Sequence, residues 1–274
     1  MTRPSRPLPA LWLAALLALL PAAWQAKADS LPIGLVRAEL LPGWRLADGR
    51  RMSALRLTLA PGWKTYWRSP GEAGISPVFD WQGSANVGAV TLHWPRPQVF
   101  DLSGYRTLAY PDELLLPVEI LPARAGDPVT LRLSADIGIC EEICVPVTIR
   151  AETALAETAA ADPAITSALA RLPADAAARG LPAARCQAEP IRDGLRLTAA
   201  IPFPATRPDA FAIVELDDRP VWTAPVETRL EGGGMVQVSD LVPADAKPFA
   251  LSRASVRMTV FDGDDVVEFQ GCKG

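Results

Sequence analysis

The sequence predicts an all-β protein made of two immunoglobulin-like β-sandwich domains joined by a short Ala-rich helical linker. Short β-type runs recur along the chain, turns rich in Pro and Gly separate them, and no amphipathic helix pattern lies between those of the first half. A chain of 274 residues is also long enough for two domains. We expect a first domain over 29–151, a linker over 152–184 and a second domain over 185–274.

The first 28 residues have the features of a secretory signal peptide. Arg3 and Arg6 precede an apolar run over 8–20, and the small residues Ala26 and Ala28 stand at the spacing of a cleavage site. The run of about 13 residues is short for a membrane anchor, which needs roughly 20. We therefore expect a cleaved signal, a periplasmic location and no membrane span in the mature chain.

The predicted mature chain is acidic. The sequence has 27 Lys and Arg against 31 Asp and Glu, and removing the three basic residues of the signal leaves 24 against 31, a net charge of −7. Nucleic-acid binding depends on a surplus of basic surface, so we expect no nucleic-acid partner. His93 is the single histidine, and the sequence has no GxSxG, HExxH, phosphate-loop or dinucleotide motif, so we do not expect hydrolysis with a histidine base.

Two cysteines follow a predicted strand of the first domain. Residues 129–136 alternate apolar and polar side chains, and a β-type pattern resumes at 145–149, directly after Cys140 and Cys144. A disulfide requires Cα atoms about 4.4–6.8 Å apart, whereas four extended residues would separate them by roughly 13 Å. If the two cysteines are bonded, they must lie in the reversal between two strands, within reach of a partner thiol.

Aromatic residues are concentrated in the first domain. Five of the six Trp of the mature chain lie before position 95, and residues 63–67 place large rings on both faces of a strand. Most of these rings should fill the core, but some must face solvent, a lid or a partner. The candidates for partner binding are Tyr66, Trp67, Tyr105 and Tyr110.

The linker is rich in alanine, which accounts for 15 of the 34 residues over 151–184. Asp162 as an N-cap, Pro163 at the first helical position and apolar residues at helical spacing predict a short helix over 162–172. A disordered Ala/Pro linker is the alternative.

The second domain again has a β-type pattern and no motif that indicates chemistry. Cys186 precedes its first predicted strand and Cys272 follows its last. Terminal strands commonly lie close together in such folds, so we expect a structural Cys186–Cys272 disulfide, worth about 4 kcal/mol in the chain-entropy model. A free or intermolecular thiol is the alternative.

Several motifs of the first domain together resemble the N-terminal periplasmic domain of the DsbD and ScsB type of disulfide reductases. In chain order they are PGWKTYWRSPGEAG (61–74), PVFDW (77–81), HWP (93–95), YPDE (110–113), LPV (116–118) and CEEICVP (140–146). The resemblance implies an immunoglobulin-like domain whose redox-active pair, Cys140 and Cys144, carries electrons without a cofactor. It further implies that Cys144 forms the mixed disulfide with a partner, that Cys140 resolves it, and that Phe100, in a cap loop over 99–104, shields the pair.

Two departures from the family pattern shape the expected partners. The CxxxC spacing looks closer to the ScsB branch than to the best-known members, which space the cysteines more widely. The full reductases continue into a transmembrane domain and a thioredoxin-like domain, which have no counterpart in this sequence. We therefore expect a separate membrane thiol reductase as electron donor, and thioredoxin-like periplasmic proteins as partners. Whether the chain is itself an enzyme, in the manner of a protein-disulfide reductase, stays open here.

The local charge predicts weakly acidic thiols. Glu141 and Glu142 lie between the cysteines, and no Lys or Arg occurs between Leu133 and Val147. Negative neighbours disfavour a thiolate, so we expect thiol pKa values at or above the free value of about 8.5. The pair would then act as a passive carrier that docking activates.

Two other roles of the pair remain compatible with the residues. It can be an inert hairpin staple in a non-catalytic binding or assembly module, including a copper-related one, or it can join His93 in holding a soft ion such as Cu(I). The reduction potential separates an exchange-active bond from a staple, because structural disulfides of secreted proteins lie below about −300 mV.

Overall fold

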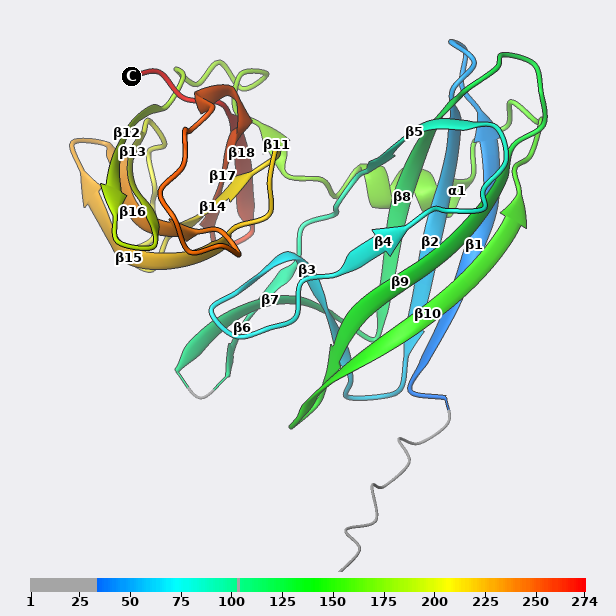
Figure 1. Ribbon diagram of the computed structural model, residues 1–274, viewed down its shortest axis with the longest axis horizontal. Helices are drawn as coiled ribbons and strands as arrows, with labels where there is room; N and C mark the ends of the chain where they lie inside the picture. The colour runs from blue at the N-terminus through cyan, green and yellow to red at the C-terminus, as the bar shows by residue number, and fades with distance from the viewer. Residues whose placement is uncertain (1–33, 103) are drawn as a thin grey trace, which may run out of the picture. The chain divides into compact units, whose positions relative to one another are not determined.

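The computed structural model describes residues 34–102 and 104–274, which contain 18 strands, one α-helix and one 3-10 turn (Figure 1). The all-β prediction is confirmed. The predicted signal peptide, residues 1–28, lies outside the described residues. Within the described part, none of the helices has the length and apolar character needed to cross a bilayer.

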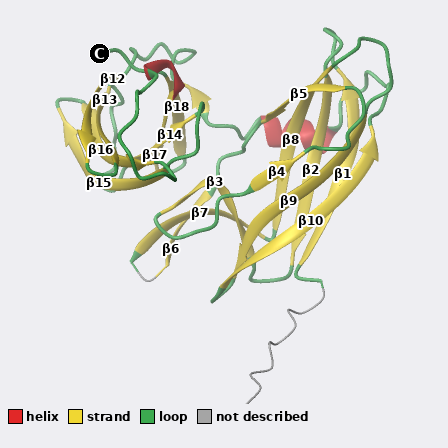
Figure 2. Cartoon of the chain, viewed as in Figure 1, coloured by secondary structure: helices red, strands yellow, loops and turns green. Residues whose placement is uncertain are grey.

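The N-terminal sheet pair consists of strands β1 to β10 (Figure 2). Its first sheet has the order β1 (Val36–Arg45), β2 (Arg51–Leu59), β8 (Glu113–Pro122), β5 (Val87–Leu92). Its second sheet has the order β10 (Cys144–Ala154), β9 (Thr130–Cys140), β3 (Lys64–Gly71), β7 (Tyr105–Pro111), β6 (Gln98–Leu102), and β4 (Val78–Asp80) also pairs with β9. Every strand pairing in the two sheets is antiparallel.

A single apolar core joins these two sheets. Leu55 and Leu116 from the first sheet share a cluster with Trp67 and Ile137 from the second, and each is 1% exposed or less. Burying such side chains contributes about 1.5–3 kcal/mol each. Inward residues alternate along most of β9, as the predicted strand pattern requires, and the strand runs on to Cys140. The core thereby fixes the strand that ends in the first cysteine.

The predicted short helix is confirmed as α1 (Pro163–Leu169). The Asp162 carboxylate accepts hydrogen bonds from the backbone N–H groups of Ala164 and Ile165, at 2.8 and 3.2 Å. Ile165 is fully buried against Met52 of β2, in a cluster separate from the core between the sheets. The helix is therefore an ordered, packed element, and the alternative of a disordered segment is wrong for these residues.

Replacing the helix cap with alanine should lower stability measurably. In Asp162→Ala, two backbone N–H groups at the start of α1 lose their acceptor, which typically costs about 1 kcal/mol. Urea unfolding should show this decrease in the free energy of unfolding, while the exposed control Asp245→Ala should stay within about 0.5 kcal/mol of the parent. Equal values for the two variants would contradict the capping role.

The C-terminal sheet pair consists of β11 to β18. One sheet has the order β11 (Ala174–Asp175), β18 (Asp265–Gln270), β17 (Val256–Asp262), β14 (Phe211–Leu216), and the other has the order β12 (Arg185–Ile191), β13 (Gly194–Ile201), β16 (Gly234–Val242), β15 (Trp222–Glu231). The 3-10 turn η1 (Arg253–Ser255) precedes β17. Buried residues of both sheets share one core. A disulfide joins Cys186 on β12 to Cys272 after β18, with a Cα–Cα distance of 5.7 Å.

Residues 34–274 form one compact unit, in which contacts run from strand β3 to the C-terminal sheets. The Arg68 guanidinium pairs with the carboxylates of Glu215 and Glu268 at 3.0 and 2.6 Å. Burial raises the pKa of Glu215, against the opposing effect of Arg68. The division of the chain into domains with the predicted boundaries stays a prediction.

Candidate functional site

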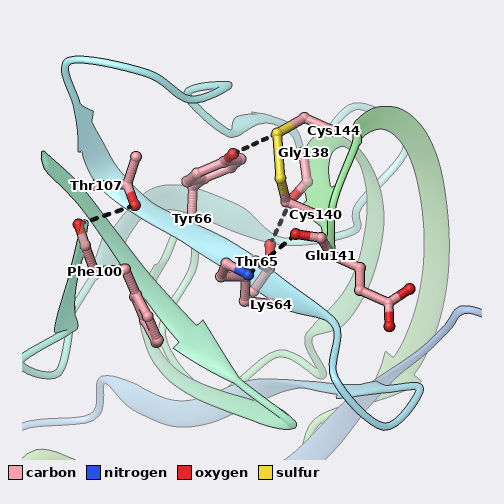
Figure 3. Close-up of a disulfide and its surroundings, with 9 residues drawn as sticks. All are labelled: Lys64, Thr65, Tyr66, Phe100, Thr107, Gly138, Cys140, Glu141 and Cys144. Atoms are coloured by element: carbon pink, nitrogen blue, oxygen red, sulfur yellow. Dashed lines mark hydrogen bonds between the residues drawn. A yellow bond between two sulfur atoms is a disulfide. The ribbon is translucent and has the colours of Figure 1, made fainter. Parts of the chain in front are cut away.

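A disulfide between Cys140 and Cys144 closes the turn that links β9 to β10 (Figure 3). Cys140 is the last residue of β9, Cys144 is the first of β10, and the two are register partners with Cα atoms 4.1 Å apart. The pair thus lies in the reversal between two strands, as the spacing of the cysteines requires.

The two sulfur-bearing residues differ in access to solvent. Cys140 is 0% exposed, whereas Cys144 is exposed, and the neighbouring Ile143 is 69% exposed. An external thiolate must reach a disulfide sulfur in order to react with it. Access therefore favours attack at Cys144, with Cys140 as the leaving group.

Tyr66 of β3 contacts the exposed cysteine directly. Its hydroxyl lies 2.9 Å from Cys144 Sγ, and it is the donor because a disulfide sulfur carries no hydrogen (Figure 3). The side chain is 2% exposed, and burial raises the pKa of the Tyr66 hydroxyl above its ordinary value of 10. The hydroxyl therefore remains a hydrogen-bond donor throughout the physiological pH range.

Two glycines make room for the Tyr66 ring. A Cβ atom on Gly138 would lie 2.6 Å from Ile75 Cβ and 2.8 Å from Tyr66 Cδ2, and one on Gly74 would lie 2.8 Å from Tyr66 Cε1. The Gly138 carbonyl also accepts a 3.0 Å hydrogen bond from Thr65 Oγ1 of β3. Gly138 in a strand interior thus marks the close approach of an aromatic ring, a known use of glycine at such positions.

The predicted shielding ring lies beside the buried cysteine. Phe100 of β6 packs against a small cluster formed by Tyr66, Ala109 and Cys140. Lys64 Nζ lies 5.5 Å from the centre of the Phe100 ring, within the range of a cation–π interaction. Residue 103 of the predicted cap loop is outside the described residues. Phe100 borders the cluster of the buried Cys140 and leaves Cys144 exposed, and its shielding function stays a prediction.

A cation that the sequence reasoning missed lies across the sheet from the cysteines. Lys64 of β3 is the register partner of Cys140 on β9, and its Nζ lies 3.5 Å from the Glu141 carbonyl oxygen, at the outer limit of a hydrogen bond. No Lys or Arg stands near the cysteines along the sequence, between Leu133 and Val147. The strand pairing supplies one from 76 positions earlier in the chain.

Two of the four predicted partner-binding aromatics are core residues. Trp67 is 0% exposed, and Tyr110 is 7% exposed with its hydroxyl donating to the Pro95 carbonyl at 2.6 Å. Neither ring presents a surface to a partner, so both assignments need correction. Tyr105, at 57% exposed, does lie at the surface, and Tyr66 meets the disulfide from the interior.

His93 follows β5 and pairs with a carboxylate of the neighbouring strand. Its Nε2 lies 3.2 Å from Glu119 of β8. Among the described residues, no three His, Cys, Asp or Glu side chains gather in a group that could hold a metal ion.

Removing the Tyr66 hydroxyl should make the Cys144 thiol less acidic. In the reduced protein, the hydroxyl can donate to a Cys144 thiolate as it does to the disulfide sulfur. Tyr66→Phe should therefore raise the thiol pKa of Cys144 by about 0.5–1 unit. The measurement is the pH dependence of alkylation in a Cys140→Ala background, with the exposed Tyr105→Phe as the matched control. A pKa equally unaffected by both changes would contradict this role.

A comparison with known protein families finds a match for the segment that contains Cys140 and Cys144. Residues 37–156 match the family model of the N-terminal domain of thiol:disulfide interchange protein DsbD. Among solved structures, the chain is similar to the N-terminal periplasmic domain of ScsB from Proteus mirabilis, with a TM-score of 0.56 and 23% identity over 87% of this chain and 92% of that one. The likeness in fold therefore extends into the C-terminal sheet pair. A comparison with curated proteins finds no match. The family match covers the segment that carries Tyr66, Cys140 and Cys144.

Proposed function

We propose that this protein is a periplasmic thiol–disulfide exchange protein that relays reducing equivalents through Cys140 and Cys144. Its partners are thioredoxin-like periplasmic proteins, and a separate membrane thiol reductase supplies the electrons. The observation that carries the proposal is the asymmetry of the bond: Cys144 is exposed and contacts the Tyr66 hydroxyl, while Cys140 is fully buried. The match of residues 37–156 to the DsbD N-terminal family supports it.

The exchange proceeds by two thiolate attacks. A thiolate of the reducing partner attacks Cys144 Sγ, a bond forms between these two sulfurs, and the Cys140–Cys144 bond breaks with its electron pair on Cys140 Sγ. A second partner thiolate then attacks the partner's own sulfur in the mixed disulfide and releases Cys144 as a thiolate. The reduced pair passes the two electrons on by the reverse sequence, in which Cys144 attacks an acceptor disulfide and Cys140 resolves the complex.

The surroundings of the pair favour selective exchange. Phe100 packs against the cluster that contains Cys140, so the cap loop restricts approach to the buried sulfur while Cys144 stays open to a partner. The Tyr66 hydroxyl stabilises negative charge on Cys144 whenever that sulfur leaves or attacks. A second disulfide, Cys186–Cys272, fits an exported protein in an oxidising compartment.

The reduction potential of the Cys140–Cys144 bond tests the proposal. Equilibration of the purified protein with thioredoxin or glutathione buffers, read by mass spectrometry of alkylated peptides, should give a potential above about −300 mV. The Cys186–Cys272 bond serves as the internal control and should remain oxidised in the same samples. If a thioredoxin-like donor leaves both bonds equally intact, the pair is a structural staple, and the protein is better described as a binding or assembly module.

A further inference from the structure

Three side chains form a row across neighbouring strands on one face of the second N-terminal sheet. Lys64 on β3 is directly opposite Cys140 on β9, which is in turn directly opposite Cys144 on β10. Directly opposed residues of antiparallel strands point to the same face, with Cβ atoms about 4.5–5.5 Å apart. Lys64 therefore flanks Cys140 on the side opposite Cys144.

The Lys64 side chain is directed towards the turn that contains the disulfide. Its Nζ contacts the carbonyl oxygen of Glu141, the residue that follows Cys140, and also lies over the Phe100 ring (Figure 3). The lysine is only half-buried, so its ammonium can remain hydrated and can shift towards a new negative charge without breaking a strong bond.

The other charged and titratable groups around Cys140 offer little compensation for a negative charge. Glu141 and Glu142 of the turn would oppose it, although the Glu141 carboxylate lies near Gly62 and points away from the sulfurs in Figure 3. Tyr66 directs its hydroxyl to Cys144. Ala109, Ile75 and Phe100, which pack in the same cluster as Cys140, are uncharged.

We propose that the Lys64 ammonium stabilises the negative charge that forms on Cys140 Sγ when a partner opens the disulfide at Cys144. In that step the partner thiolate forms a bond to Cys144 Sγ, and the electron pair of the broken bond moves to Cys140 Sγ, which has no access to solvent in the closed structure. Lys64 thus assists the leaving group. This role rests on the proposed exchange function and opposes the effect of the acidic turn.

The test uses Lys64→Met, which keeps an apolar stem of similar length, Lys64→Arg, which restores a cation, and Lys247→Met as the matched control at an exposed lysine. Each full-length oxidised protein is reduced with dithiothreitol and with tris(hydroxypropyl)phosphine, which is uncharged, so that attraction of the attacking thiolate can be separated from stabilisation of the leaving one. The thiol pKa of Cys140 is measured in a Cys144→Ala background by thiolate absorbance.

Lys64→Met should slow reduction by both reagents about two- to five-fold and raise the Cys140 thiol pKa by about 0.5–1 unit. Lys64→Arg should restore most of both values, Lys247→Met should change neither, and added salt should shrink the difference. Unchanged reduction rates and an unchanged Cys140 pKa in Lys64→Met would overturn the proposal. Faster reduction would also overturn it, because it would show that Lys64 only holds the Phe100 ring in place.

The same proteins distinguish this proposal from the exchange function. Failure of the parent protein to react with a thioredoxin-like donor would remove the exchange function, while the rates with the two small reductants would still measure the effect of Lys64. Normal exchange by the parent, together with small-reductant rates that Lys64→Met leaves unchanged, would remove only the role of Lys64.

Discussion

Cys144→Ala is expected to abolish mixed-disulfide formation with thioredoxin-like partners, whereas Cys140→Ala should accumulate a mixed disulfide through Cys144. The reason is access: Cys144 is exposed, and Cys140 is 0% exposed beneath its neighbours. Removal of the buried cysteine leaves the reactive sulfur in place but removes the thiol that resolves the complex. The yield of trapped complex should therefore differ between the two variants by at least about ten-fold.

Trapping in periplasmic extract, followed by non-reducing electrophoresis and mass spectrometry, measures this difference and names the captured partner. The Cys186–Cys272 bond stays intact in both variants and serves as the control for general thiol reactivity. A complex that forms through Cys140 in Cys144→Ala would reverse the assigned roles. The absence of complexes from both variants would favour a structural bond.

The lengths of the two disulfide loops fit a structural role for Cys186–Cys272 and an exchange role for Cys140–Cys144. In the chain-entropy model, a bond between residues 86 positions apart stabilises the fold by about 4–5 kcal/mol, and one between residues four apart by only about 2 kcal/mol. The β9–β10 ladder holds the ends of the short loop together even without the bond. Opening of Cys140–Cys144 therefore costs the fold less than opening of Cys186–Cys272.

Local pattern was sufficient to predict the elements that carry the cysteines. The apolar alternation before Cys140, the distance limits of a disulfide and the resumed pattern after Cys144 together required a strand reversal, which the structure contains. The start of α1 could be predicted for the same reason, because Asp162 and Pro163 are adjacent in sequence to the helical residues that they cap. In each case, the relevant atoms lie within a few residues of one another along the chain.

The functional surroundings of the disulfide depend on strand register, which a single sequence does not specify. Lys64 and Tyr66 reach the cysteines only because β3 pairs with β9, and each contacting pair is more than 70 positions apart along the chain. Burial had the same limitation. Trp67 and Tyr110 are aromatic residues of the kind that often bind partners. Their burial in the core becomes evident only once the strands are paired. Gly138 likewise is needed because the Tyr66 ring of another strand, β3, packs against it.

Gly138→Ala is expected to destabilise the protein and to displace the Tyr66 ring at the site. The added Cβ would lie 2.6 Å from Ile75 Cβ and 2.8 Å from the Tyr66 ring, both closer than real contacts allow. Since the ring must shift, its hydroxyl should lose the contact with Cys144. Overpacking of this kind typically costs about 1–3 kcal/mol, which urea unfolding would detect. Ser134→Ala, on the same strand, is the control for substitution with alanine.

The same variant separates a positional effect on Tyr66 from a general loss of stability. If Gly138→Ala acts by moving the Tyr66 hydroxyl, its effect on the Cys144 thiol pKa should not add to that of Tyr66→Phe, because the second change removes the group that the first displaces. Fully additive effects would mean that Gly138 influences Cys144 by another route. An unchanged free energy of unfolding would mean that Ile75 and the ring relax without cost, and that the glycine is not required for packing.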